Sequence, residues 1–105
     1  MPAVARANGA DTVFSATGSG RGCRGPLNTV TGPGSSTLYI GGAQVVVQGD
    51  PVGSHPASGC GPDLSTLSTF STTVFVGGKG VGRVGDQYTS DNTITSGTSS
   101  LFVGG

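Results

Sequence analysis

The chain has 105 residues, a formal net charge of zero, and a composition in which glycine and proline make up about a quarter of all residues. A chain of this length forms one small domain, and a hydrophobic fraction of 33% without tryptophan implies a thin core. The balanced charge and the lack of a basic run give no support to nucleic-acid binding.

The N-terminal residues, MPAVARANGAD, carry no charged segment followed by an apolar one, so we expect no signal peptide. No apolar run reaches the length of a membrane span. We therefore expect the protein to fold in a cytoplasm, where its two cysteines stay reduced.

In chain order, short strands alternate with loops rich in Gly, Ser and Thr. Along TLYIGGAQVVVQGD (37–50) the side chains alternate in direction, with Leu38 and Ile40 on one side and Tyr39 on the other, and the two central glycines suit a tight hairpin turn. No segment keeps a helical period, so the sequence predicts an all-β domain. The predicted strands and hairpins are 2–7, 36–48, 72–84 and 100–103, and the predicted loops are 12–34, 51–70 and 87–97.

The hairpin sequence is repeated. TVFVGGKGVGRVGD (73–86) matches 37–50 in the first strand and its Gly-Gly pair, at Val45 and Val81, and in the closing Gly-Asp, and a third copy begins with SLFVGG at 100–105. The missing half of that copy is PAVAR at 2–6, which resembles KGVGR at 79–83. We infer a single domain over residues 1–105 with three hairpins around a pseudo-threefold axis, the third split between 100–105 and 2–6.

Each predicted loop follows an aspartate, and in a threefold arrangement all three loops leave the hairpins on the same side. This places Cys23, His55 and Cys60, the only cysteines and the only histidine, in one region. Asp91 joins them, because it follows Asp86 at the spacing by which His55 follows Asp50.

These residue types suit a metal ion. Thiolates and imidazole are preferred zinc ligands, and a carboxylate can complete a tetrahedral set. Arg21 and Arg24 flank Cys23 and favour its thiolate form. We expect zinc rather than iron, held by Cys23, His55, Cys60 and Asp91, with Asp91 the weakest of the four.

Other interpretations stay open. One alternative is a disulfide between Cys23 and Cys60, if the mature protein functions outside cells. Two independent alternatives are that His55 is an ordinary loop residue before a proline and that Asp91 caps a turn with Asn92. The aspartates at 11, 50 and 86 are expected to form turns by bonding to their own backbone. A nucleophilic pair of Cys60 and His55 lacks an orienting third group, so we expect no enzyme.

The strands SSTLYIGG, STTVFVGG and TSSLFVGG, together with PAVAR, GGKGVGRVGD and GDPVGSHP, resemble the PAAR-repeat family over essentially the whole chain. The resemblance implies a small cone whose base sits on a trimeric β-helical spike and whose apex is held by zinc, typically through three His and one Cys. This chain offers one His and two Cys, so Asp91 or water is left as the fourth ligand.

The resemblance also implies a mechanical function. We expect a structural tip that sharpens the spike of a contractile phage tail or type VI secretion system and contacts the target outer membrane transiently. It would be made in a host cytoplasm and reside in a virion at the tail baseplate, or be secreted at the tip of a type VI apparatus. The third repeat uses the last residue, so we expect no fused toxin.

The docking face is predicted from aromatics at matching positions, Tyr39, Phe75 and Phe102. We expect them to meet the spike, with one chain per spike trimer and no self-trimer. The alternative is that these three side chains belong to the core. Two other functions compete: a free-standing metal or thiol redox protein, and a β-repeat fibre or adhesin module that trimerises without metal.

Overall fold

The structure is a computed structural model and describes residues 2–15, 27–53, 65–89 and 92–104. All regular elements in these residues are short antiparallel strands, which confirms the all-β class. Within the same ranges there is no helix that could cross a membrane. The strands are β1 (Thr12–Ser15), β2 (Leu27–Val30), β3 (Tyr39–Ile40), β4 (Ala43–Gln44), β5 (Phe75–Val76), β6 (Lys79–Gly80) and β7 (Asn92–Ile94).

Two hairpins share the same turn. β3 pairs with β4 and β5 pairs with β6, each across two glycines with positive φ. The φ angles are 62° and 85° at Gly41 and Gly42, and 60° and 79° at Gly77 and Gly78. Residues with a side chain rarely adopt these angles, so the Gly-Gly pair is what allows each two-residue turn.

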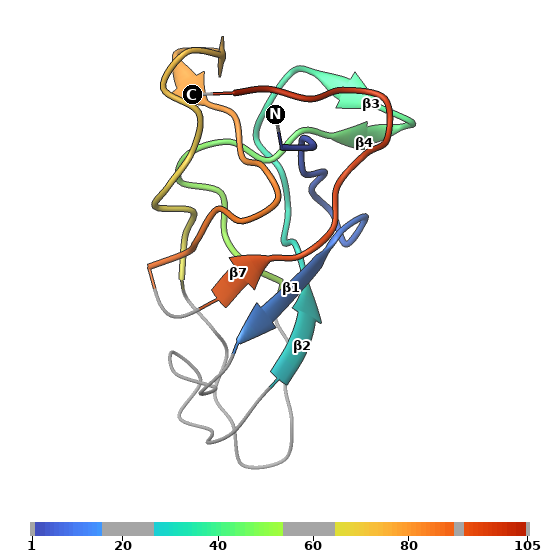
Figure 1. Cartoon of the computed structure of the whole chain (residues 1–105), viewed down its shortest axis with the longest axis vertical. Coiled ribbons are helices and arrows are strands. Elements are labelled where there is room, and N and C mark those ends of the chain that lie inside the picture. The colour runs from blue at the N-terminus through green and yellow to red at the C-terminus, as the bar shows by residue number, and fades with distance from the viewer. Residues whose placement is uncertain (1, 16–26, 54–64, 90–91, 105) are drawn as a thin grey trace.

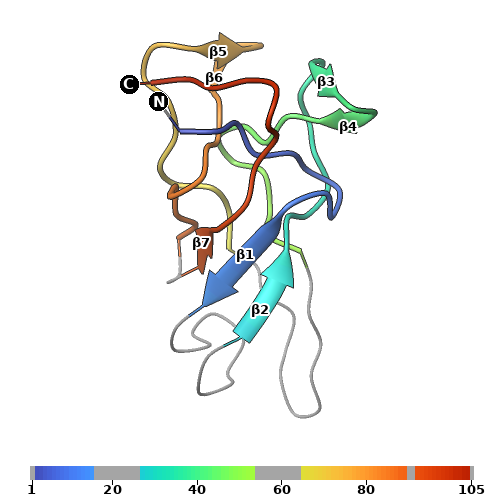
Figure 2. The same cartoon turned by 45° about the vertical axis from the view of Figure 1, so that its right-hand side comes forward.

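The third hairpin is built from the two ends of the chain. Ala3 lies opposite Phe102, and the termini lie close together in both views (Figures 1 and 2). All three hairpins close with the same backbone hydrogen bond. These bonds run from Val4 N–H to Leu101 O at 3.0 Å, from Val45 N–H to Leu38 O at 2.9 Å, and from Val81 N–H to Val74 O at 3.1 Å.

Three backbone hydrogen bonds join the hairpins in a cycle. Ala5 donates to Gly82 at 3.0 Å, Gly82 donates to Val46 at 2.7 Å, and Val46 donates back to Ala5 at 3.0 Å. Space on this axis is limited, because a Cβ at position 82 would lie 2.9 Å from Leu67 Cδ2 and 3.1 Å from Val46 Cγ1. The cycle places the repeated sequences around one pseudo-threefold axis.

Below this cycle, six extended segments form a closed ring. Each segment is antiparallel to both neighbours, so the three segments that run away from the hairpins alternate with the three that return. The ends at which loops 16–26, 54–64 and 90–91 attach therefore all lie on the side away from the hairpins. Around the ring, the pairs are Thr12↔Val30, Thr31↔Val52, Pro51↔Thr66, Leu67↔Tyr88, Gln87↔Thr93 and Val13↔Ile94.

The core consists of two apolar clusters, one under the hairpins and one inside the ring. The hairpin cluster is almost entirely valine, and its buried members are Val4, Val45, Val47, Val81 and Val103. The ring cluster comprises Ala5, Ala7, Val13, Val46, Val52, Leu67, Tyr88 and Ile94.

A buried aspartate joins each hairpin to the ring. The carboxylate of Asp86 accepts the N–H of Arg83 at 2.8 Å and the Thr69 hydroxyl at 3.0 Å. Asp11 and Asp50 make the same two kinds of bond, so the prediction that these residues form turns is confirmed. Arginine forms an ion pair with two of the three, at 3.1 Å for Arg6–Asp11 and 2.9 Å for Arg83–Asp86.

The third turn departs from this pattern, because Val47 occupies the position of the two arginines and is buried in the hairpin cluster. In the other two turns, the pKa values of Arg6 and Arg83 are raised, chiefly by the hydrogen bonds to Asp11 and Asp86. Asp50 is held by the Ser35 hydroxyl at 2.5 Å and the N–H of Val47 at 3.0 Å.

We expect Asp86→Ala to lower the free energy of unfolding by about 2–3 kcal/mol, because it leaves the Arg83 N–H and the Thr69 hydroxyl without their acceptor. Asp86→Asn, which keeps one acceptor oxygen, should cost less. Urea denaturation measures both variants. A loss below about 0.5 kcal/mol in the alanine variant, the range of ordinary surface substitutions, would contradict this role.

Two of the three predicted loops are wrong in part. β1 and β2 lie within the segment 12–34, and β7 lies within 87–97. These strands are three or four residues long and pair mainly with segments distant in sequence, so they leave little periodic pattern in the chain.

Tyr88 is the only aromatic residue of the ring cluster that is fully buried. Its hydroxyl has no hydrogen-bond partner in the described part of the structure. Burial raises the pKa of Tyr88 well above 10.0, and the charge of Asp50 raises it further. The pseudo-threefold axis relates Tyr88 to Val13 and Val52, whose side chains have no polar atom that needs a hydrogen-bond partner.

Because the pKa of Tyr88 is raised in the folded state, the unfolded chain loses this proton first as pH rises. Its contribution to stability is present below pH 10 and is lost above it, with a slope of up to about 1.4 kcal/mol per pH unit. Tyr88→Phe should remove that slope, measured by urea denaturation between pH 9 and about 11. Tyr39→Phe, which removes an exposed phenol, is the control, and an equal effect of the two variants would refute the assignment.

Candidate functional site

Three exposed aromatic side chains mark the hairpin end of the molecule. Tyr39, Phe75 and Phe102 are 59%, 53% and 48% exposed, and they occupy the same position in the three hairpins. They are therefore not core residues. The following residue of each strand, Ile40, Val76 or Val103, instead packs in the hairpin cluster, so strand alternation turns the aromatics outward.

The surroundings of these aromatics are apolar. Leu38 and Val74, which precede Tyr39 and Phe75, are also exposed. Of the large hydrophobic residues exposed in the described structure, only Val30 on β2 lies elsewhere. Lys79 is the only charged side chain in the segments 2–4, 38–45, 74–81 and 101–104, and we call these segments together the hairpin face.

The opposite end carries the attachment points of the three loops. Cys23, His55, Cys60 and Asp91 all lie in those loops and fall outside the described residues. Within the described ranges, no group of three His, Cys, Asp or Glu side chains is placed to hold a metal ion. The structure thus describes the positions from which the predicted ligand loops start and end.

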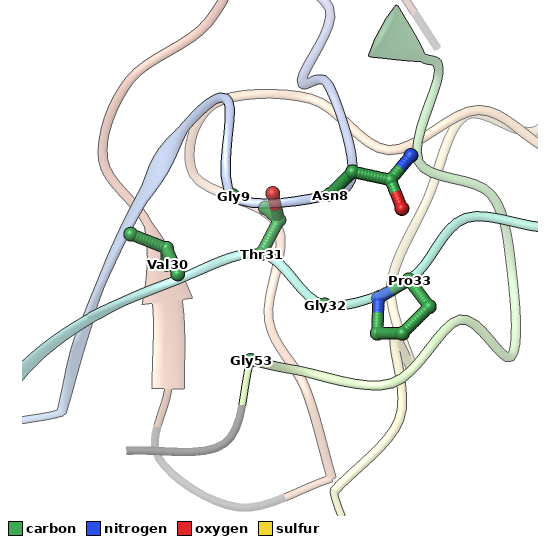
Figure 3. A pocket seen from close by; sticks show the side chains of 7 residues that line it. All are labelled: Asn8, Gly9, Val30, Thr31, Gly32, Pro33 and Gly53. Atoms are coloured by element: carbon green, nitrogen blue, oxygen red, sulfur yellow. The ribbon is translucent and has the colours of Figure 1, made fainter.

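A shallow hollow of about 350 Å³ lies on the side of the ring (Figure 3). Asn8 and Gly9 form one wall, residues 30–33 form another, and Gly53 closes the base. Among the residues that the structure describes, no acid, base or thiol lines it, and the Thr31 hydroxyl is already bonded to the backbone oxygen of Arg6 at 2.6 Å. The described lining of the hollow therefore supplies no catalytic group.

A family model described as PAAR motif matches residues 17–88, more than half of the chain. The chain belongs to the PAAR motif family. Members of this family are spike-tip proteins of contractile injection systems, a structural class. A search of curated proteins finds no match.

The PAAR match contains three of the four predicted metal ligands and two of the three exposed aromatics. Cys23, His55 and Cys60 lie within residues 17–88, whereas Asp91 and Phe102 lie beyond them. The part of this PAAR protein outside the match still belongs to the same fold, because residues 2–6 supply the backbone groups that complete the cycle and the third hairpin.

Sequence reasoning missed one feature of this PAAR fold, a set of buried polar side chains at the loop end of the ring. The signal was present as Ser, Thr or Asn next to each loop boundary, but such residues are common in loops of this composition. The set consists of Ser15, Thr29, Ser65 and Asn92.

Proposed function

We propose that this PAAR protein is a structural tip that caps the trimeric β-helical central spike of a contractile tail or injection machine and sharpens it for piercing a target envelope. The observation that carries the proposal is the hairpin face, which presents one exposed aromatic residue three times around a pseudo-threefold axis.

Symmetry favours a trimeric partner. A homotrimer ends in a face with true threefold symmetry, and a single chain with three similar hairpins can match it at three equivalent places. Tyr39, Phe75 and Phe102 would each meet the same surface of a different spike subunit. One PAAR chain then satisfies the whole spike end.

Burial of this face would be favourable because it is apolar and almost uncharged. Removing apolar surface from water stabilises a complex by roughly 25 cal/mol per Å², before the costs of association. Aromatic anchors of this kind commonly dominate the binding energy of an interface. A charge at the centre of the face would lose most of this gain, because it would be buried without a partner.

At the other end, we propose a zinc ion held by Cys23, His55, Cys60 and, as the weakest ligand, Asp91. Two thiolates, one imidazole and one carboxylate form a donor set that suits zinc better than iron. All three ligand loops attach on the same side of the ring, which supports the assignment. When bound, the ion would act as a structural crosslink between the loops rather than as a catalyst.

The two ends together suit a mechanical part. The fold has a thin core that consists largely of valine and alanine, and a crosslink at the loop end would stiffen Gly-rich segments that bear load. The tip would sit at the end of the spike, in a virion or on a type VI apparatus, and would touch the target outer membrane only during penetration. No chemical step is needed for this role, so we propose that the protein is not an enzyme.

To test docking, we would introduce Phe75→Asp and Phe102→Asp and measure co-purification with the trimeric spike from the same tail system. We expect the double variant to bind the spike at least 100-fold more weakly, because each new charge would be buried in the interface without a partner. The thermal stability of the isolated chain should stay unchanged, because Phe75 and Phe102 are both exposed in it. Val30→Asp is the matched control, since Val30 is exposed off the hairpin face and should bind normally. Normal capping by the double variant would contradict the proposal.

The metal proposal has its own test. Purified protein should contain about one zinc per chain, and Cys60→Ser or His55→Ala should lose the metal and much of the thermal stability. Elemental analysis and calorimetry measure both quantities. A metal-free protein with unchanged melting, or a native Cys23–Cys60 disulfide, would refute this part of the proposal and leave the docking proposal intact.

A further inference from the structure

The interior of the ring combines apolar and polar side chains at the end where the loops attach. In each loop-bearing pair of segments, the outgoing segment points an apolar residue inward: Val13, Val52 or Tyr88. The returning segment places a buried polar residue across from it. The polar partners are Thr29 opposite Val13, Ser65 opposite Val52, and Asn92 opposite Tyr88.

Ser15 adds a fourth member to this set. It lies directly across from Asn92 in the β1–β7 pairing, and both side chains are fully buried. We call Ser15, Thr29, Ser65 and Asn92 the polar layer. Burying four polar side chains in a thin core is unfavourable unless each is satisfied, and none of the four lacks an interaction partner.

One interaction of the polar layer fixes the start of a ligand loop. The Thr29 hydroxyl donates to the backbone oxygen of Gly53 at 3.3 Å, and the N–H of Gly53 donates to the oxygen of Val30 at 2.8 Å. A Cβ at Gly53 would collide with that same Val30 oxygen, so only glycine fits. The chain is therefore held from both sides two residues before His55.

We propose that the polar layer positions the metal-ligand loops, with Thr29 holding the segment that leads to His55. This inference rests on the proposed metal site. Groups that hydrogen-bond to metal ligands commonly change metal affinity by about 10- to 100-fold. Thr29 acts one step further away, on the backbone two residues before His55, so we expect an effect at the low end of that range. The polar layer is placed for this role, because its members adjoin the loops that contain Cys23, His55, Cys60 and Asp91.

The test uses the full chain loaded with Zn²⁺ or Co²⁺. Thr29→Val keeps the shape of the side chain but removes its hydroxyl, and it should release Zn²⁺ to a chromophoric chelator about 10-fold faster and shift the Co²⁺ absorption spectrum. Thr29→Ser keeps the hydroxyl and should restore both properties. Thr98→Val is the matched control, because Thr98 is 5% exposed against 6% for Thr29 and lies at the hairpin end.

The outcomes separate this inference from the metal proposal. Faster release from Thr29→Val alone, with rescue by Thr29→Ser, supports it. A Thr29→Val protein with the wild-type rate and spectrum overturns it, and so does an equal effect of Thr98→Val, which would reflect general destabilisation. A wild-type chain that binds neither Zn²⁺ nor Co²⁺ overturns the proposed metal site together with this inference.

Discussion

The rest of the fold depends on the cycle of backbone hydrogen bonds among Ala5, Val46 and Gly82. Each residue donates to the next, so no hairpin keeps its place without the other two. The axis leaves little room for a side chain at position 82, and the cycle brings residues 2–6 against both internal hairpins. Because the cycle has three members, everything attached to it is presented three times, and this repetition gives the molecule its two different ends.

The same repeat produces opposite surfaces at these ends. Toward the hairpins, strand alternation buries valines and exposes Tyr39, Phe75 and Phe102. Toward the loops, the ring ends in buried Ser, Thr and Asn side chains. The buried turn aspartates connect the hairpins to the ring, because their carboxylates accept hydrogen bonds from backbone N–H groups and from hydroxyl groups. An apolar threefold face at one end and three loop attachments at the other suit a part that docks at one end and carries loops at the other.

The sequence was sufficient to predict the hairpins and their symmetry, because the Gly-Gly turns and the alternation of residues 37–50 recur at 73–86. It was not sufficient for β1, β2 and β7, which are short and are defined by pairing with distant segments. Alternation also could not decide whether Tyr39 faces the core or solvent, since a half-buried strand has both faces. The polar layer was missed because serine and threonine in a Gly-rich loop give no sign of burial.

The most direct test of the central claim, that one pseudo-threefold chain caps a threefold partner, is the stoichiometry of the reconstituted complex. Native mass spectrometry of the spike trimer mixed with excess PAAR protein measures it without any variant. We expect one PAAR chain per spike trimer, because the three hairpins of one chain occupy all three equivalent places at once. Three chains per trimer would contradict it, since each spike subunit would then bind a separate copy.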